Sequence, residues 1–126
     1  MDFKLELVPM PVTDVDAAKA FYAEKMGFKV DLDFRNGETF RVVQLTPPGS
    51  ACSIAIGTGV VGTAPGSVQG LHLVVTDIHG AVDELRGRGV EVADVVDMTA
   101  PGKPTVSYAA FTDPDGNGWT LQQIGS

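Results

Sequence analysis

The sequence contains the same unit twice, and this repeat limits the possible folds more than any other feature. Val-Thr-Asp occurs at positions 12–14 and again at 75–77, an offset of 63 residues in a chain of 126. Each copy follows an apolar run and precedes a segment with helical spacing that ends at a glycine, Gly27 or Gly89. A self-match at so long a period indicates one supersecondary unit used twice.

The repeated unit is predicted to be a strand, a helix and three further strands. Apolar side chains recur at helical spacing after each Val-Thr-Asp, and the other runs are short and apolar or alternate with polar residues. Glycine, proline and Asn-Gly turns separate these runs. The helices are expected at residues 15–26 and 78–88, and the strands at 5–12, 28–34, 39–45, 51–56, 69–75, 90–96, 105–112 and 119–124.

Local chemistry adds detail to three of these elements. Thr13 or Asp14 is a natural N-cap for the first helix. Prolines at 9 and 11 cannot donate backbone hydrogen bonds, so the first strand is expected at a sheet edge or half-paired. The strand at 28–34 alternates apolar with charged residues and is predicted to be half-buried. Its apolar members are Phe28, Val30, Leu32 and Phe34.

The predicted fold class is α+β. Two βαβββ modules, at about 1–57 and 69–126, are joined by a glycine-rich linker at about 58–68 and form a single domain over 1–126. Neither module can bury a full core alone, so we expect them to pair into a curved mixed sheet around a cleft, with the helices outside. The sequence leaves open whether the modules pair within one chain or swap across a dimer.

Composition excludes several classes of partner. The net charge is −7, which argues against nucleic-acid binding because that needs a basic face. The only cysteine, Cys52, allows no intrachain disulfide and suits a reducing compartment. The chain begins without the pattern of a signal peptide, and no apolar run approaches the roughly 18 residues of a membrane span. We therefore expect a soluble cytoplasmic protein with no membrane partner.

Three stretches together resemble the vicinal oxygen chelate superfamily, also called the glyoxalase/bleomycin-resistance/dioxygenase family. They are Val-Thr-Asp with Ala-Phe-Tyr at 20–22 and Gly-Phe at 27–28, the copy at 75–77, and Phe-Thr-Asp-Pro-Asp-Gly-Asn at 111–117. The resemblance covers the whole chain and implies paired modules around a cleft, usually in a homodimer. Such proteins include metal-dependent isomerases, epimerases, lyases and dioxygenases, and also metal-free proteins that confer resistance by binding a drug.

The resemblance also implies where a metal would be held. The corresponding positions are Leu7 on the first strand, residues 53–56 on the fourth, Gly70 on the fifth and Thr120 on the last. None of these side chains is a good ligand for a divalent ion, and such a site generally needs three or four imidazole, thiolate or carboxylate donors. We therefore predict no metal and no other cofactor.

Strand alternation then indicates which neighbours would share the cleft face. Pro9 lies on the same face as Leu7, and Gln122 on the same face as Thr120. His72 lies on the same face as Gly70 and is the candidate catalytic residue, as a general acid or base. The alternative is a histidine that is satisfied inside the fold.

Three further residues are candidates for ligand binding. Arg41 would hold an anionic group, or else pair with a nearby acid such as Asp31 or Asp33. Tyr108 and Trp119 would stack on a flat ligand, or else pack in the core or a dimer interface. The sequence does not decide which face of the third strand lines the cleft.

The first functional hypothesis is therefore a metal-free protein that binds an apolar or aromatic small molecule in the cleft, similar to bleomycin-resistance proteins. The alternative is a glyoxalase-like lyase or isomerase, or a dioxygenase-like enzyme, that depends on a metal or uses His72 as a base. Neither the ligand nor the existence of a reaction follows from the residues.

Overall fold

A computed structural model describes residues 1–125 and divides into two compact units. The first unit comprises Met1–Val68 together with the turn Pro114–Asn117. The second comprises Gln69–Asp113 and the strand that begins at Gly118. The chain therefore returns to the first unit for four residues between the last two strands of the second.

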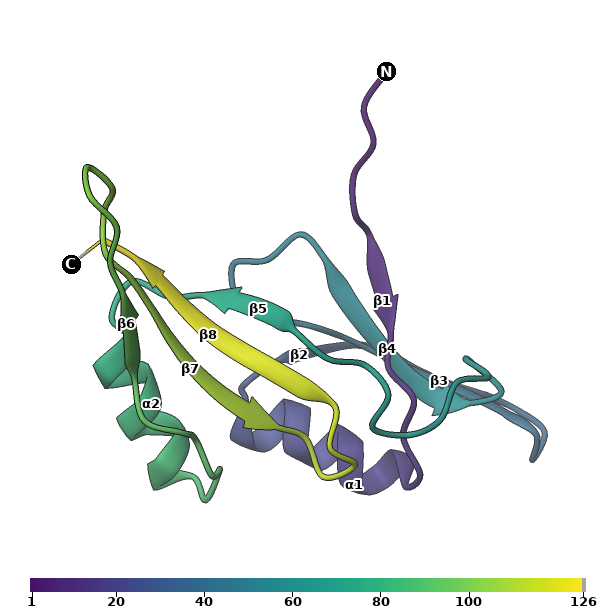
Figure 1. Ribbon diagram of the computed structural model, residues 1–126. Helices are drawn as coiled ribbons and strands as arrows, with labels where there is room; N and C mark the ends of the chain where they lie inside the picture. The colour runs from purple at the N-terminus through teal and green to yellow at the C-terminus, as the bar shows by residue number, and fades with distance from the viewer. Residues whose placement is uncertain (126) are drawn as a thin grey trace. The chain divides into compact units, whose positions relative to one another are not determined.

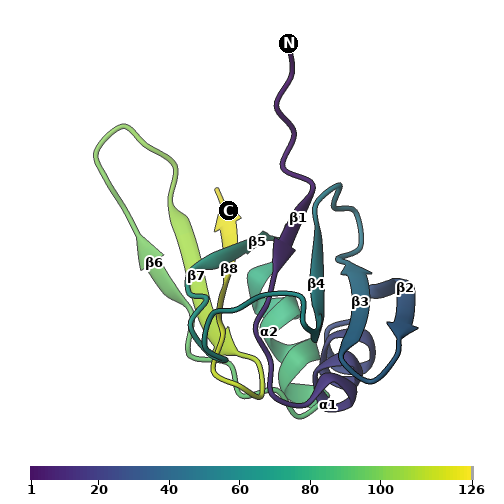
Figure 2. The same cartoon turned by 90° about the vertical axis from the view of Figure 1, so that its right-hand side faces the viewer.

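The first unit is a four-stranded mixed sheet with one helical segment (Figure 1). The strand order is β1-β4-β3-β2, which Figure 2 shows from β1 across to β2. β1 runs parallel to β4, and the other pairs are antiparallel. The elements are β1 (Leu7–Pro9), α1 (Val15–Ala20), η1 (Phe21–Lys25), β2 (Lys29–Asn36), β3 (Phe40–Thr46) and β4 (Ser53–Thr58).

The second unit repeats this arrangement, with strand order β5-β8-β7-β6 and a parallel β5–β8 pair. Its elements are β5 (Leu71–Val74), α2 (Ile78–Gly87), β6 (Val96–Met98), β7 (Val106–Thr112) and β8 (Gly118–Ile124). The α+β class and the two βαβββ units are thus confirmed. In the part of the chain that the structure describes, no helix is long and apolar enough to cross a membrane.

The repeated Val-Thr-Asp has the same structural role in both units. The side chain of Asp14 accepts a hydrogen bond of 3.0 Å from the backbone N–H of Ala17 and caps α1. Asp77 accepts an equivalent bond of 3.0 Å from Gly80 and caps α2. Both aspartates satisfy amide groups that have no partner within the helix, which is the preferred chemistry of an N-cap. The predicted cap at Asp14 is confirmed.

The first helix and the sixth strand differ from the sequence prediction. The helix expected over 15–26 is α-helical only to Ala20 and continues as the wider π-helical turn η1, where the N–H of Met26 bonds to the carbonyl of Phe21 at 3.1 Å. This turn buries Tyr22 completely, with its ring 5.6 Å from that of Phe28. The strand expected at 90–96 begins only at Val96, as β6. Before it, over the described residues 90–95, an isolated bridge between Val92 and Phe111 of β7 is the only strand pairing.

The prediction of a half-buried strand at 28–34 is wrong for β2. Val30, Leu32 and Phe34 are 36%, 46% and 50% exposed. A bulge between Val30 and Leu32 shifts the register, and Asp33 instead bonds to Arg41 of β3 and to Lys19 of α1. Asp33 therefore faces α1, whereas Asp31 accepts from Thr46 on the other side of the sheet.

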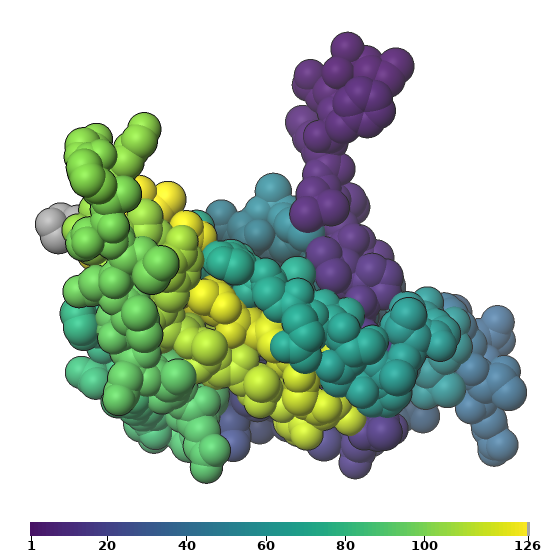
Figure 3. All heavy atoms as spheres, viewed as in Figure 1, coloured from purple at the N-terminus to yellow at the C-terminus, as the bar shows by residue number. Residues whose placement is uncertain are grey.

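The first residues of the chain carry a further row of exposed apolar side chains. Met1, Phe3 and Leu5 are 103%, 90% and 72% exposed and alternate with charged residues. The backbone pairing of this segment begins only at Glu6, whose carbonyl accepts from Ser53 at 2.9 Å. Figure 3 shows these purple residues standing away from the strand that follows them.

The turn Pro114–Asn117 is tied into the first unit by side-chain hydrogen bonds. Asn117 is fully buried; its Nδ2 donates to the carbonyl of Pro11 at 2.9 Å, and its Oδ1 accepts from the backbone N–H of Val68 at 3.2 Å. Asp115 accepts from the N–H and the hydroxyl of Thr13. Buried polar groups need hydrogen-bond partners, and the one amide of Asn117 supplies a partner to Pro11 and to Val68, which are far apart in sequence.

Replacing Asn117 with alanine should lower the free energy of unfolding by about 2–4 kcal/mol, because the substitution leaves the half-buried N–H of Val68 and the buried carbonyl of Pro11 without their partner. Urea denaturation measures this change. The matched control is Asn36→Ala, which removes the exposed amide at the end of β2 and should cost no more than about 0.5 kcal/mol. Equal losses in the two variants would contradict a structural role for the buried amide.

Candidate functional site

Four of the predicted ligand-binding residues lie together on one face of the second sheet. His72 of β5 pairs with Thr120 of β8, and Gln122 of β8 pairs with Tyr108 of β7. Paired residues point to the same side of a sheet, so the four side chains form one continuous group across three strands. We call the face that carries His72, Tyr108, Thr120 and Gln122 the open face of the second unit.

The geometry within this group is specific. The rings of His72 and Tyr108 are 6.0 Å apart and nearly perpendicular, at 87°. Nδ1 of His72 lies 2.7 Å from the backbone carbonyl of Gly70. His72 is exposed, and the other three side chains are half-buried. The group therefore presents accessible hydrogen-bonding atoms beside an aromatic edge.

Uncharged side chains surround this group. By strand register, the other residues on the open face of the second unit are aliphatic, sulfur-containing or small, and none is ionised. Val74, Val96, Met98 and Ile124 are all more than half exposed. The sequence reasoning did not single out this apolar surface; the signal that identifies it is the pairing of β6 with β7, which places Val96 opposite Tyr108. Exposed apolar area of this kind commonly marks a binding surface.

The corresponding face of the first sheet carries two more of the predicted residues. Leu7 pairs with Ser53, and Pro9 pairs with Ala55. Beside them the hydroxyl of Thr46 lies 2.6 Å from the hydroxyl of Ser53 and also donates to Asp31. Leu7 and Pro9 are therefore on the side of their sheet that is expected from alternation, next to a small polar network that the sequence did not indicate.

Arg41 lies on the opposite, helix-facing side of β3 and is already paired. Its guanidinium contacts Asp33 through two hydrogen bonds of 3.0 and 2.9 Å and Asp16 through one of 2.7 Å. These bonds to Arg41, and that of Asp33 to Lys19, hold the pKa of Asp33 well below its usual range and also lower the pKa of Asp16. The same contacts raise the pKa of Arg41. Arg41 therefore pairs with acids, which was the alternative that the sequence left open, and it lies outside the candidate site.

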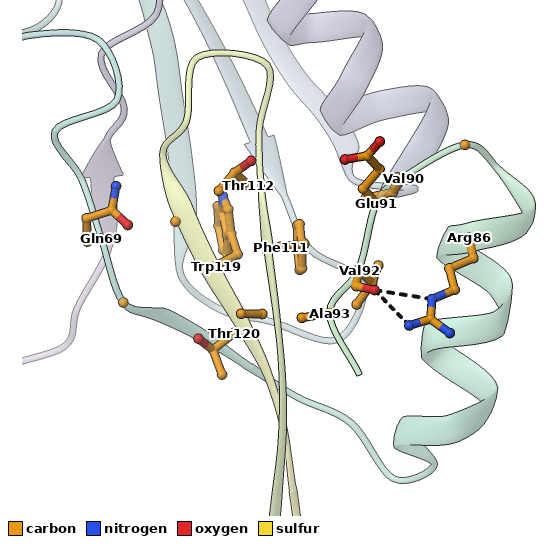
Figure 4. A pocket seen from close by; sticks show the side chains of 14 residues that line it. Gln69, Arg86, Val90, Glu91, Val92, Ala93, Phe111, Thr112, Trp119 and Thr120 are labelled. Atoms are coloured by element: carbon orange, nitrogen blue, oxygen red, sulfur yellow. Dashed lines mark hydrogen bonds between the residues drawn. The ribbon is translucent and has the colours of Figure 1, made fainter. Parts of the chain in front are cut away.

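Trp119 is buried on the side of the second sheet that faces α2. Its side chain is 3% exposed and stacks on Phe111, with the rings 6.3 Å apart and 7° from parallel. It also lines the wall of a cavity of about 850 Å³ within the second unit, shown in Figure 4. In that cavity Arg86 donates to the carbonyl of Val92. Thr120 lines the same cavity, so the cavity adjoins the open face.

The positions that the resemblance connects with a metal are occupied by Leu7, Gly70, Thr120 and residues 53–56. Residues 1–125 contain no group of three or more histidine, cysteine, aspartate or glutamate side chains placed to hold an ion. Hydroxyl and aliphatic groups have little affinity for divalent metals, so the donor set does not fit the metal that the resemblance implies.

Comparison with known families assigns the chain. Residues 4–121 match the Glyoxalase/Bleomycin resistance protein/Dioxygenase superfamily. The chain belongs to this superfamily. A comparison with curated proteins gave no significant match.

Solved structures of the superfamily resemble the chain over almost its full length. One is TnmS3, an antibiotic binding protein from Streptomyces sp. CB03234, with 32% identity, coverage of 98% of each chain and a TM-score of 0.81. Another is a glyoxalase/bleomycin resistance protein from the same organism, with 33% identity, coverage of 95% of this chain and 100% of that one, and a TM-score of 0.76. A superfamily member from Sphaerobacter thermophilus DSM 20745 has 28% identity, coverage of 97% and 98%, and a TM-score of 0.79.

The ion pairs of Arg41 should make stability depend on pH through Asp33. Because folding lowers the pKa of Asp33 from its usual 3.8, the stabilisation is present above that value and is lost as the pH falls below it. The variant Asp33→Asn should therefore be less stable than the native chain by about 1 kcal/mol at neutral pH, and the difference should shrink near pH 3, about one unit below the usual pKa.

Urea unfolding at the two pH values measures this difference. Asp83→Asn, at an exposed position of α2, serves as the control and should leave the pH dependence unchanged. A difference for Asp33→Asn that is as large in acid as at neutral pH would show that its carboxylate charge is not what stabilises the fold.

Proposed function

We propose that this chain is a metal-free small-molecule-binding protein, similar to bleomycin-resistance proteins, and that its ligand lies on the open face of the second unit. The observation that carries the proposal is the group of His72, Tyr108, Thr120 and Gln122 on three adjacent strands. Small-molecule sites commonly combine a mostly apolar surface with a few polar groups that fix orientation. The similarity to TnmS3, an antibiotic binding protein, supports this role.

The chemistry of the face favours an apolar or aromatic ligand. Val74, Val96 and Met98 offer exposed aliphatic and thioether surface, and the edge-to-face pair of His72 and Tyr108 offers an aromatic boundary. Burying about 100 Å² of such apolar surface contributes about 2.5 kcal/mol. The hydrogen-bonding side chains would then select among ligands of similar shape.

The alternative function is that of an enzyme, a lyase, isomerase or dioxygenase, that requires a metal or uses His72 as a base. The accessible imidazole of His72 is the observation in its favour. A metal-dependent reaction is disfavoured by the hydroxyl, aliphatic and glycine residues at the expected ligand positions. The alternative therefore depends on His72 alone.

We further propose that the chain acts as a homodimer in the cytoplasm. Exposed apolar residues on β2 and on the N-terminal segment, Leu32, Phe34 and Phe3 among them, are surface that a second copy would cover. Sedimentation equilibrium tests this part of the proposal, and a monomer at micromolar concentration would contradict it.

The first experiment tests the absence of a metal. Elemental analysis of protein purified without chelators should find far less than one divalent ion per chain, and later chelation should leave ligand binding unchanged. One ion per chain whose removal abolishes an activity would instead support the enzymatic alternative.

The second experiment locates the ligand. Aromatic antibiotics that raise the melting temperature should bind Thr120→Trp at least about tenfold more weakly, because the indole would occupy the middle of the polar group. The matched control is Thr39→Trp in the exposed turn between β2 and β3, which should bind as the native chain does. Equal affinities for the two variants in calorimetric titrations would exclude the open face as the site.

A further inference from the structure

We infer that the ligand presents a hydrogen-bond donor to Nε2 of His72, and that it is an uncharged hydroxylated aromatic compound. This inference rests on the proposed function and specifies the ligand of that site. It depends on three features of the second unit: the partner of Nδ1, the direction in which the ring is held, and the lack of charge around it.

The first feature decides which ring nitrogen carries the proton. The carbonyl of Gly70 lies 2.7 Å from Nδ1 of His72, and a carbonyl oxygen can only accept a hydrogen bond. Nδ1 must therefore be the donor. A neutral imidazole has a single ring proton, so Nε2 is left with its lone pair and acts as an acceptor.

The second feature makes Nε2 available to a ligand. The bond to Gly70 and the perpendicular contact with the ring of Tyr108, at 6.0 Å, fix the imidazole at both sides. His72 is nevertheless exposed, and within the described part of the second unit no side chain or backbone group donates to Nε2. A fixed and unused acceptor on a binding face selects ligands that bring a donor.

The third feature concerns the charge of that donor. Thr120, Gln122 and Tyr108 surround the imidazole, and by register the face carries no carboxylate to compensate a ligand ammonium and no cation to compensate an anion. Placing an unpaired charge on an apolar surface is costly. The donor is therefore neutral, and the flat apolar surroundings favour a hydroxyl on an aromatic ring over one on a flexible chain.

A matched pair of probes tests the inference. 2-Naphthol and 2-methoxynaphthalene share one aromatic body, and only the naphthol carries a donor. At about pH 8, where histidine is ordinarily neutral, calorimetric titration of the full chain should give a dissociation constant about fivefold lower for 2-naphthol, the value expected for one hydrogen bond. In His72→Phe, which keeps an aromatic ring but lacks the acceptor, the two constants should become equal.

His79→Phe serves as the control, because His79 is exposed at the start of α2 and should retain the fivefold preference. Equal binding of both probes to the native chain, with both weakened in Thr120→Trp, would overturn the inference and leave the proposed site intact. A preference that persists in His72→Phe would also overturn it. Failure of both probes to bind, or binding that Thr120→Trp leaves unchanged, would contradict the proposed function itself.

Discussion

The buried amide of Asn117 is the interaction on which the arrangement of the first unit depends. It joins Pro11, just before the first helix cap, to Val68, where the first unit ends. Asp115 adds its bonds to Thr13 from the same turn. The turn thus contacts the start of the first unit twice, through the buried amide of Asn117 and, at the surface, through Asp115 and the threonine of Val-Thr-Asp.

Features with local causes could be predicted from the sequence. Helix caps, turn glycines and the order of elements depend on neighbouring residues, and the two sheets share one topology as the repeat indicated. The exposure of the apolar side chains of β2 was not predictable in this way, because Asp33 bonds to Arg41 and Lys19, partners from another strand and from α1. The π-helical turn at Phe21–Lys25 likewise depends on how Tyr22 packs rather than on apolar spacing alone.

The candidate site shows the same division. Alternation correctly grouped Thr120 with Gln122, but the sequence could not place Tyr108 beside them, since that depends on the register between β7 and β8. Register also places Trp119 against Phe111 rather than on the open face. The bond between His72 and the carbonyl of Gly70 could not be predicted from the sequence. It joins a side chain to the backbone at a glycine with φ of 81°. At the position that the resemblance connects with a metal ligand, this chain has a glycine whose carbonyl is bonded to a histidine.

The return of the chain to the first unit at Pro114–Asn117 has a consequence for biosynthesis. A ribosome releases the N-terminal strands and helix long before it has translated the turn that completes their hydrogen bonding. The first unit therefore cannot reach its final state while the nascent chain is still short, because residues up to Asn117 must emerge first. Folding of the first unit therefore depends on translation of the second. A product terminated before Pro114 would lack the turn that completes the hydrogen bonds of the first unit.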